Sequence, residues 1–326
     1  MDSTTTTISS AFDNYGYSPD LGGNAFFAVC WGLNLIAEII LNVKTKQLFL
    51  GVCFPFGCLI ECIGFICRSL SSHNTSSLGL FLMNLIGSVL GPVFILAGIY
   101  SSFGMIVQLY NPIYSLVKPI NYRRIFIVLD VLSFLAQFAG DGMASQLKSV
   151  NMSPTPGFQV LAIGRILQLV SMTIFIIFVS IFFGKLHKAH KRGSLKRETE
   201  IYAFVRESTF FKLMVSSLLF AVFCIYIRTI YRVAALSGGY QNGVMIDEKM
   251  FFGLDSAMVL FASILISGFY PGVCFQQMTD SDDATKMNFP KATEVIYSSN
   301  QTIRSSETNK TSNTTDFYEL KKIYQV

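Results

Sequence analysis

The chain has 326 residues, of which 52% are hydrophobic and only 14% are charged. A soluble globular domain carries about 25% charged residues, so this composition excludes an ordinary soluble protein and indicates a membrane protein. The formal net charge of +5 comes mainly from basic loops, which fits attraction to anionic lipid and gives no support to nucleic-acid binding.

Seven segments are long and apolar enough to cross a membrane as helices, because about 20 apolar residues span the hydrocarbon layer. They cover 24–43, 48–67, 79–103, 125–147, 158–184, 210–236 and 250–274. Their continuous apolar runs differ from the roughly ten-residue alternating segments of a membrane barrel. We therefore predict an all-α membrane protein. Its seven-helix domain (24–274) lies between an extracellular tail (1–23) and a polar, disordered cytoplasmic tail (275–326).

The loops after the first, third and fifth spans hold most of the basic residues, which are Lys44, Lys46, Lys118, Arg123, Arg124, Lys185, Lys188, Lys191, Arg192, Lys196, Arg197 and Arg206. The opposite loops contain little more than Arg68, Lys148 and Lys249. Because cytoplasmic loops keep the excess of Lys and Arg, this asymmetry predicts an outer N-terminus and a cytoplasmic C-terminus. The glycosylation sequons at Asn74 and Asn151 then fall outside the cell.

Several kinds of chemistry have no sequence signal. The three histidines, His73, His187 and His190, all lie in loops, so no intramembrane metal site is expected. The chain contains neither a G-x-x-x-x-G-K-[ST] phosphate loop nor a G-x-S-x-G nucleophile motif. We expect no metal, no cofactor and no enzymatic activity.

Charged residues inside the spans are the strongest functional signal, because each costs about 2.5 to 3.5 kcal/mol at a helix centre. Glu61, Arg228, Arg232 and Asp255 all fall in the predicted outer half. Arg228 and Arg232 share one helix face, as do Glu61 and Arg68 seven residues apart. We predict that Arg68 lies above Glu61 and that the two arginines of the sixth span contact carboxylates on the second and seventh spans.

A second polar group is predicted in the inner half, from Glu38, Asp130 and Gln137. One site near each membrane face is typical of an alternating-access pathway. Two polar clusters that only hold helices together would give the same pattern. Both interpretations stay open at this point. The pattern Gly87-Ser-Val-Leu-Gly91 is interpreted as close helix packing.

The motifs resemble the fungal RTA-like family of lipid-translocating exporters over about 15–275. The matching runs are residues 60–68 (IECIGFICR), Gly91-Pro92, Gly98-Ile99-Tyr100, Asp130-Val131-Leu132-Ser133 with Gln137 and Gly140, Arg228 with Tyr231-Arg232, Glu248, Leu254-Asp255 and Pro271-Gly272. The third span is most similar to the branch implicated in the release of sphingoid long-chain bases. The resemblance implies a plasma-membrane protein with a role in lipid asymmetry or in resistance to toxic amphiphiles.

The sequence also departs from the family pattern. Ala235 stands where the family usually has an acid, Asp141 replaces a second glycine, and an arginine common near the end of the third span is replaced around Met105. The changes at 235 and 141 can relocate a negative charge rather than remove it.

The leading hypothesis is a translocator that moves a sphingoid base or similar cationic amphiphile. An ammonium head group needs carboxylates, so the predicted substrate contacts are Glu61, Asp255, Asp130 and Glu38, with Gln137 added. Ion pairing or gating is assigned to Arg228, Arg232, Arg68 and Asp141. The predicted partners are membrane lipids and the amphiphile, and the oligomeric state stays open.

Two other hypotheses remain. One is a seven-helix receptor that senses lipid asymmetry or an extracellular ligand, because the topology fits it equally well. The other is a resistance factor that acts only through other transporters. Flux of a labelled lipid through the purified protein distinguishes the first hypothesis from both.

Overall fold

The computed structural model describes residues 15, 17–74, 77–110, 112–150, 152–192, 208–237 and 247–276. Seven helices in these ranges are long and apolar enough to cross a membrane. Six are the single helices α1 (Leu21–Thr45), α2 (Leu48–Ser71), α3 (Leu78–Tyr110), α4 (Pro119–Ser149), α5 (Thr155–Lys191) and α8 (Thr209–Ser237). The described residues contain no strand. The prediction of an all-α protein with seven membrane-length helices is confirmed, whereas the terminus orientation and the domain division stay predictions.

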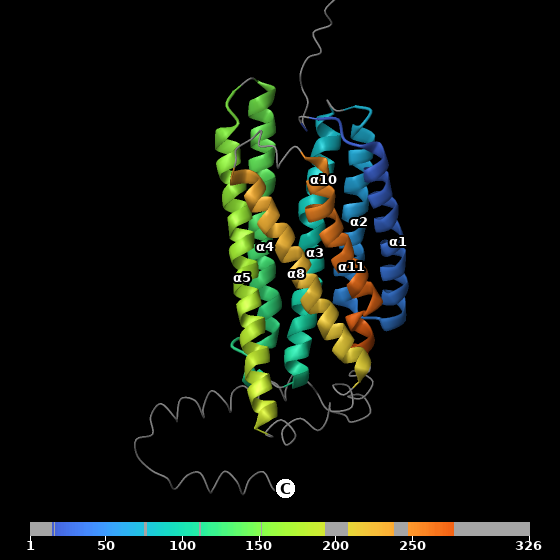
Figure 1. Cartoon of the computed structure of the whole chain (residues 1–326), viewed down its shortest axis with the longest axis vertical. Helices are drawn as coiled ribbons and strands as arrows, with labels where there is room; N and C mark the ends of the chain where they lie inside the picture. The colour runs from blue at the N-terminus through green and yellow to red at the C-terminus, as the bar shows by residue number, and fades with distance from the viewer. Residues whose placement is uncertain are drawn as a thin grey trace, which may run out of the picture.

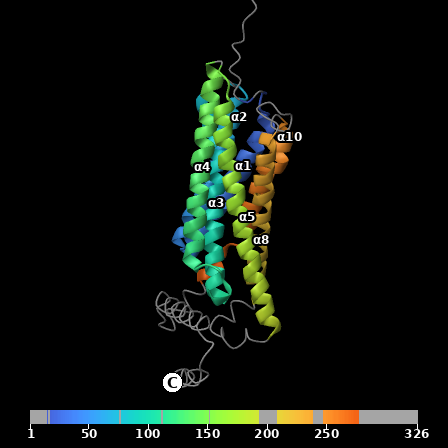
Figure 2. The same ribbon diagram turned by 90° about the vertical axis from the view of Figure 1, so that its left-hand side faces the viewer.

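The helices form an elongated bundle with their axes roughly parallel to its long axis (Figures 1 and 2). Helix α3 packs against α2 and α4 and also contacts α8, and its span is the most buried of the seven. Helix α8 crosses the bundle obliquely in Figure 1 and packs against both α11 and α5. Side chains of α2, α3 and α8 therefore meet inside the bundle.

The seventh span, Glu248–Gln276, is irregular. It begins with the short helix α10 (Glu248–Met250), continues as the π-helix η3 (Phe251–Ser256) and then becomes α11 (Ala257–Gly268). The helix is interrupted at Phe269 and Tyr270 and resumes at 271–276. Since π-helical turns are rare and occur frequently at functional sites, the position of Asp255 in this segment is notable.

Helix α1 presents apolar residues outward and polar residues inward. Its strongly exposed side chains include Phe26, Val29, Leu33 and Ile36, which recur at helical spacing and form a lipid-facing stripe. Its buried face includes Asn24, Trp31, Asn34 and Glu38. The buried face of α1 therefore adds polar groups to a bundle interior that is otherwise mostly apolar.

Glycines bring two helix pairs into backbone contact. A Cβ on Gly87 of α3 would lie 2.7 Å from the Cα of Gly64 on α2, which agrees with the packing interpretation of the Gly87–Gly91 motif. Between α4 and α5, a Cβ on Gly140 would lie 2.4 Å from the backbone nitrogen of Leu161. These contacts need residues without side chains.

We expect Gly140→Ala to lower the free energy of unfolding by about 1 to 3 kcal/mol, because the added methyl forces α4 away from α5. Gly142→Ala is the matched control on the same helix, since no atom lies within 4 Å of the position that its methyl group would take. Thermal unfolding of both variants in detergent measures the difference. Equal unfolding temperatures would contradict the tight α4–α5 contact.

Candidate functional site

A cluster of buried charges lies in the half of the bundle at which α1 begins. Asp255 of η3 accepts two hydrogen bonds from Arg232 of α8, from Nε at 2.6 Å and from Nη2 at 2.7 Å. The Nε of Arg228, one turn earlier on α8, lies 3.0 Å from the Oδ1 of Asp255. A two-pronged arginine–carboxylate contact is strong and directional, so Asp255 fixes α8 against the seventh span.

The same arginines also attach α8 to α3 through Ser88. The Nη2 of Arg232 donates to the Ser88 hydroxyl oxygen at 2.9 Å. The Nη2 of Arg228 donates to the Ser88 backbone carbonyl oxygen. Both guanidinium groups therefore make polar contacts with two neighbouring elements, as a buried charge requires.

Glu61 of α2 is buried, with 3% of its surface exposed. It makes no hydrogen bond or salt bridge with any residue that the structure describes, although Arg228 and Arg232 interact with it electrostatically. Its side chain lies against Gly91 of α3, where a Cβ would come within 2.5 Å of the Glu61 Cγ. The predicted arginine contact with the seventh span is present, but the salt bridge predicted with the second span is not formed.

Arg165 of α5 belongs to the cluster and was missed by the sequence reasoning. It is 6% exposed, and its Nη1 donates to the backbone carbonyl oxygen of Arg232 at 2.9 Å. Arg165 interacts electrostatically with Asp141 of α4, and so does Arg232. Arg165 is the one charged residue of the apolar run 158–184, so the signal that identified Arg228 could have found it.

Together the cluster contains three acids, Glu61, Asp141 and Asp255, and three arginines, Arg165, Arg228 and Arg232. They come from α2, α4, α5, α8 and η3. If all six are ionised their charges cancel, which reduces the cost of placing them inside a membrane. Five separate chain segments thereby contribute charges to one cluster inside the bundle.

Arg68 lies outside this cluster, at the end of α2. It forms a salt bridge with Glu248 at 3.4 Å and donates a hydrogen bond to the Tyr17 hydroxyl. Its guanidinium carbon also lies 4.1 Å from the centre of the Phe251 ring and 5.1 Å from that of Tyr15. Arg68 and Glu61 are both on the buried face of α2, as predicted. Arg68 makes its own contacts in a terminal cap, which we define as Tyr15, Tyr17, Arg68, Glu248 and Phe251.

The cap also orders the residues before α1. Burial raises the pKa of both Tyr15 and Tyr17, while the charge of Arg68 opposes that increase. The backbone nitrogen of Asp20 donates to Glu248 at 2.9 Å. The start of α1, the end of α2 and the start of the seventh span are thus held together at one end of the bundle.

Glu38 lies in a second polar cluster, formed by α1 and α11. One carboxylate oxygen accepts a hydrogen bond from the Ser267 hydroxyl at 2.6 Å, and the other has no hydrogen-bond partner. Asn34, one turn earlier, donates to Ser263 at 2.7 Å, and its Oδ1 lies 2.9 Å from the same Ser267 hydroxyl oxygen. Among the described residues no cation forms a salt bridge with Glu38.

Asp130 occupies a third polar cluster, formed by α3, α4 and α5. It accepts hydrogen bonds from the hydroxyl groups of Tyr100 at 2.8 Å and Ser171 at 3.4 Å. Gln137, two turns later on α4, donates to Gln168 at 3.0 Å. The prediction that Glu38, Asp130 and Gln137 form one group is therefore wrong, because Glu38 uses different helices and different partners.

Two further predictions concern metal binding and glycosylation. No group of three or more His, Cys, Asp or Glu residues in the described ranges could hold a metal ion. Asn74 is exposed in the connection between α2 and α3, whereas Asn151 lies outside the described residues.

The chain is similar to a known protein family. The family described as "RTA1 like protein" matches residues 54–278. The chain is 28% identical over 288 residues to the sphingoid long-chain base transporter RSB1 of Saccharomyces cerevisiae, covering 82% of this chain and 75% of that protein. It is 26% identical over 280 residues to the protein RTA1 of the same yeast, covering 78% of this chain and 83% of RTA1.

The protein RTM1 of Saccharomyces cerevisiae is 27% identical over 230 residues, which is 69% of each chain. Comparison with solved structures gave no match. The family match begins in α2 and extends past the seventh span, so it includes Glu61, Asp130, Arg228, Arg232 and Asp255. This chain, with seven membrane-length helices in its described residues, belongs to the RTA1-like family.

Proposed function

We propose that this protein moves a sphingoid long-chain base, or a similar cationic amphiphile, across the plasma membrane toward the outer leaflet. The support comes from its family and from its 28% identity with a sphingoid long-chain base transporter. The proposed orientation has the N-terminus outside, which would also place the exposed Asn74 where glycosylation occurs.

The observation that carries this proposal is that Glu61 has no salt-bridge partner among the described residues and can therefore pair with a cation. Asp255 already engages both Arg228 and Arg232, so Glu61 is left as a buried carboxylate without a salt bridge to any described residue. A buried carboxylate is stabilised when it pairs with a cation. The ammonium group of a sphingoid base supplies such a cation, while its alkyl chain can stay among the lipid tails.

Asp130 and Glu38 are proposed as further contacts along the pathway. Both are completely buried, and both accept hydrogen bonds from neutral hydroxyl groups. Each therefore keeps the capacity to bind a cation, which a carboxylate fixed by arginine lacks. Gln137 is a weaker candidate, because its amide is already bonded to Gln168.

Reconstitution of the purified protein in vesicles tests the proposal. We expect it to move a fluorescent sphingoid base between leaflets without any partner protein, and faster than empty vesicles do. A neutral analogue with the same chain and a hydroxyl in place of the amine should move more slowly. Binding of the base without flux would instead favour a receptor, and would refute the translocator proposal.

A further inference from the structure

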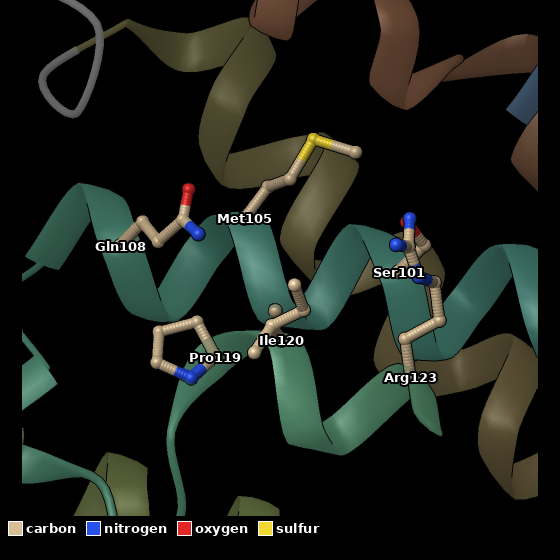
Figure 3. Close-up of a pocket in the computed structure, with 7 residues that line it drawn as sticks. Ser101, Met105, Gln108, Pro119, Ile120 and Arg123 are labelled. Atoms are coloured by element: carbon tan, nitrogen blue, oxygen red, sulfur yellow. The ribbon is translucent and has the colours of Figure 1, made fainter. Parts of the chain in front are cut away.

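A small pocket lies between α3 and α4, far along the bundle from the charged cluster. It has a volume of about 150 Å³ and is lined mainly by Ser101, Met105, Gln108, Pro119, Ile120 and Arg123 (Figure 3). Helix α3 ends and α4 begins beside it. None of these residues belongs to the three carboxylate sites described above.

Three polar side chains of this pocket have no polar partner among the described residues. Ser101, Gln108 and Arg123 make no hydrogen bond or salt bridge there. Arg123 is instead placed with its guanidinium carbon 4.5 Å from the centre of the Phe49 ring. Figure 3 shows the pocket with the Gln108 amide at one end and Arg123 at the other. The pocket thus provides hydrogen-bond donors and one positive charge that are all available to a ligand.

The surroundings favour an anion at the membrane surface. The basic side chains Lys44, Lys46, Lys118 and Arg124 are exposed at the same end of the bundle. Ile120, which lines the pocket, is 45% exposed, and Ile113 and Leu116, in the connection between α3 and α4, are 47% and 43% exposed. A soluble anion would gain nothing from these apolar side chains, whereas a lipid has acyl chains that contact them.

We propose that this pocket binds the phosphate group of a membrane phospholipid. Arg123 supplies the charge, while the Ser101 hydroxyl and the Gln108 amide donate hydrogen bonds to phosphate oxygens. The acyl chains lie along the exposed apolar surface beside Ile120. This site is independent of the proposed transport pathway, so it can exist whether or not the protein moves sphingoid bases.

Native mass spectrometry of the purified full chain with two defined lipids tests the site. Phosphatidic acid and diacylglycerol with identical acyl chains differ only by the phosphate. We expect the protein to retain phosphatidic acid at least about tenfold more strongly, which corresponds to one charge-assisted hydrogen bond. Equal retention of the two lipids would overturn the proposal.

Arg123→Gln should remove this preference, whereas Arg124→Gln, the adjacent and exposed arginine, should keep it. Gln108→Leu provides a second test if Arg123→Gln does not fold, and it should weaken phosphatidic acid binding without affecting diacylglycerol. Equal losses in the Arg123 and Arg124 variants would indicate general surface attraction and refute a specific site. Glycerol 3-phosphate that displaces the lipid at equal concentration would show a site for free anions, which also refutes the proposal.

Discussion

Replacing Glu61 by Gln is expected to lower transport of a labelled sphingoid base by roughly two orders of magnitude, because losing one member of a buried charge pair costs about 2 to 5 kcal/mol. Gln has nearly the same shape as Glu, and Glu61 makes no salt bridge or hydrogen bond with the described residues. The variant should therefore fold and reach the membrane in normal amounts. Flux in vesicles containing equal quantities of wild-type and variant protein measures the effect.

Gly91→Ala provides an independent way to disturb Glu61 without changing its charge. Its methyl group would lie 2.5 Å from the Glu61 Cγ, so the carboxylate must move. Gly79→Ala, on the same helix, is the matched control because nothing lies within 4 Å of the place where its methyl group would sit. We expect reduced flux only for Gly91→Ala. Unchanged flux in both Glu61→Gln and Gly91→Ala would remove Glu61 from the proposed pathway.

Replacing Asp255 by Asn is expected to lower the free energy of unfolding by about 3 to 5 kcal/mol, since it leaves two buried arginines without their partner. Arg232 loses both of its charge-assisted contacts, and Arg228 loses the carboxylate oxygen 3.0 Å from its Nε. Thermal unfolding in detergent without substrate measures the loss. Asp247→Asn is the control, because Asp247 caps α10 and Asn caps a helix about as well as Asp.

A double variant separates the ion pair from other effects of the substitution. Arg232→Gln combined with Asp255→Asn should be more stable than the sum of the two single losses predicts, by about 0.5 to 3 kcal/mol for residues in contact. Strict additivity would show that the contact does not stabilise the fold. An Asp255→Asn variant with the same unfolding temperature as the wild-type protein would lead to the same conclusion.

The sequence predicted the number of spans well, because continuous apolar length is a strong signal for a membrane helix. It predicted their ends less well. The fourth span was predicted at 125–147 and the helix runs over Pro119–Ser149, while the fifth was predicted at 158–184 and runs over Thr155–Lys191. Hydropathy marks the hydrocarbon layer, whereas backbone hydrogen bonding continues beyond it. The π-helix around Asp255 gave no signal in the apolar pattern.

The pairing of charges was harder to predict, because spacing shows which residues share a helix face but not which helix that face meets. Arg228 and Arg232 were correctly placed on one face toward the seventh span. Glu38 was grouped with Asp130 only because both were assigned a similar depth, yet their partners lie on α11 and on α3 with α5. The partner of Arg68, Glu248, is 180 residues away along the chain.

The order of the charged residues along the chain also has a consequence for biosynthesis. Arg228 and Arg232 are translated before Asp255, the carboxylate that pairs with both of them. Each unpaired arginine makes insertion of a helix less favourable by about 2.5 to 3.5 kcal/mol at its centre. Helix α8 is therefore expected to remain near the translocon until the seventh span emerges, so that the two enter the lipid together as a hairpin.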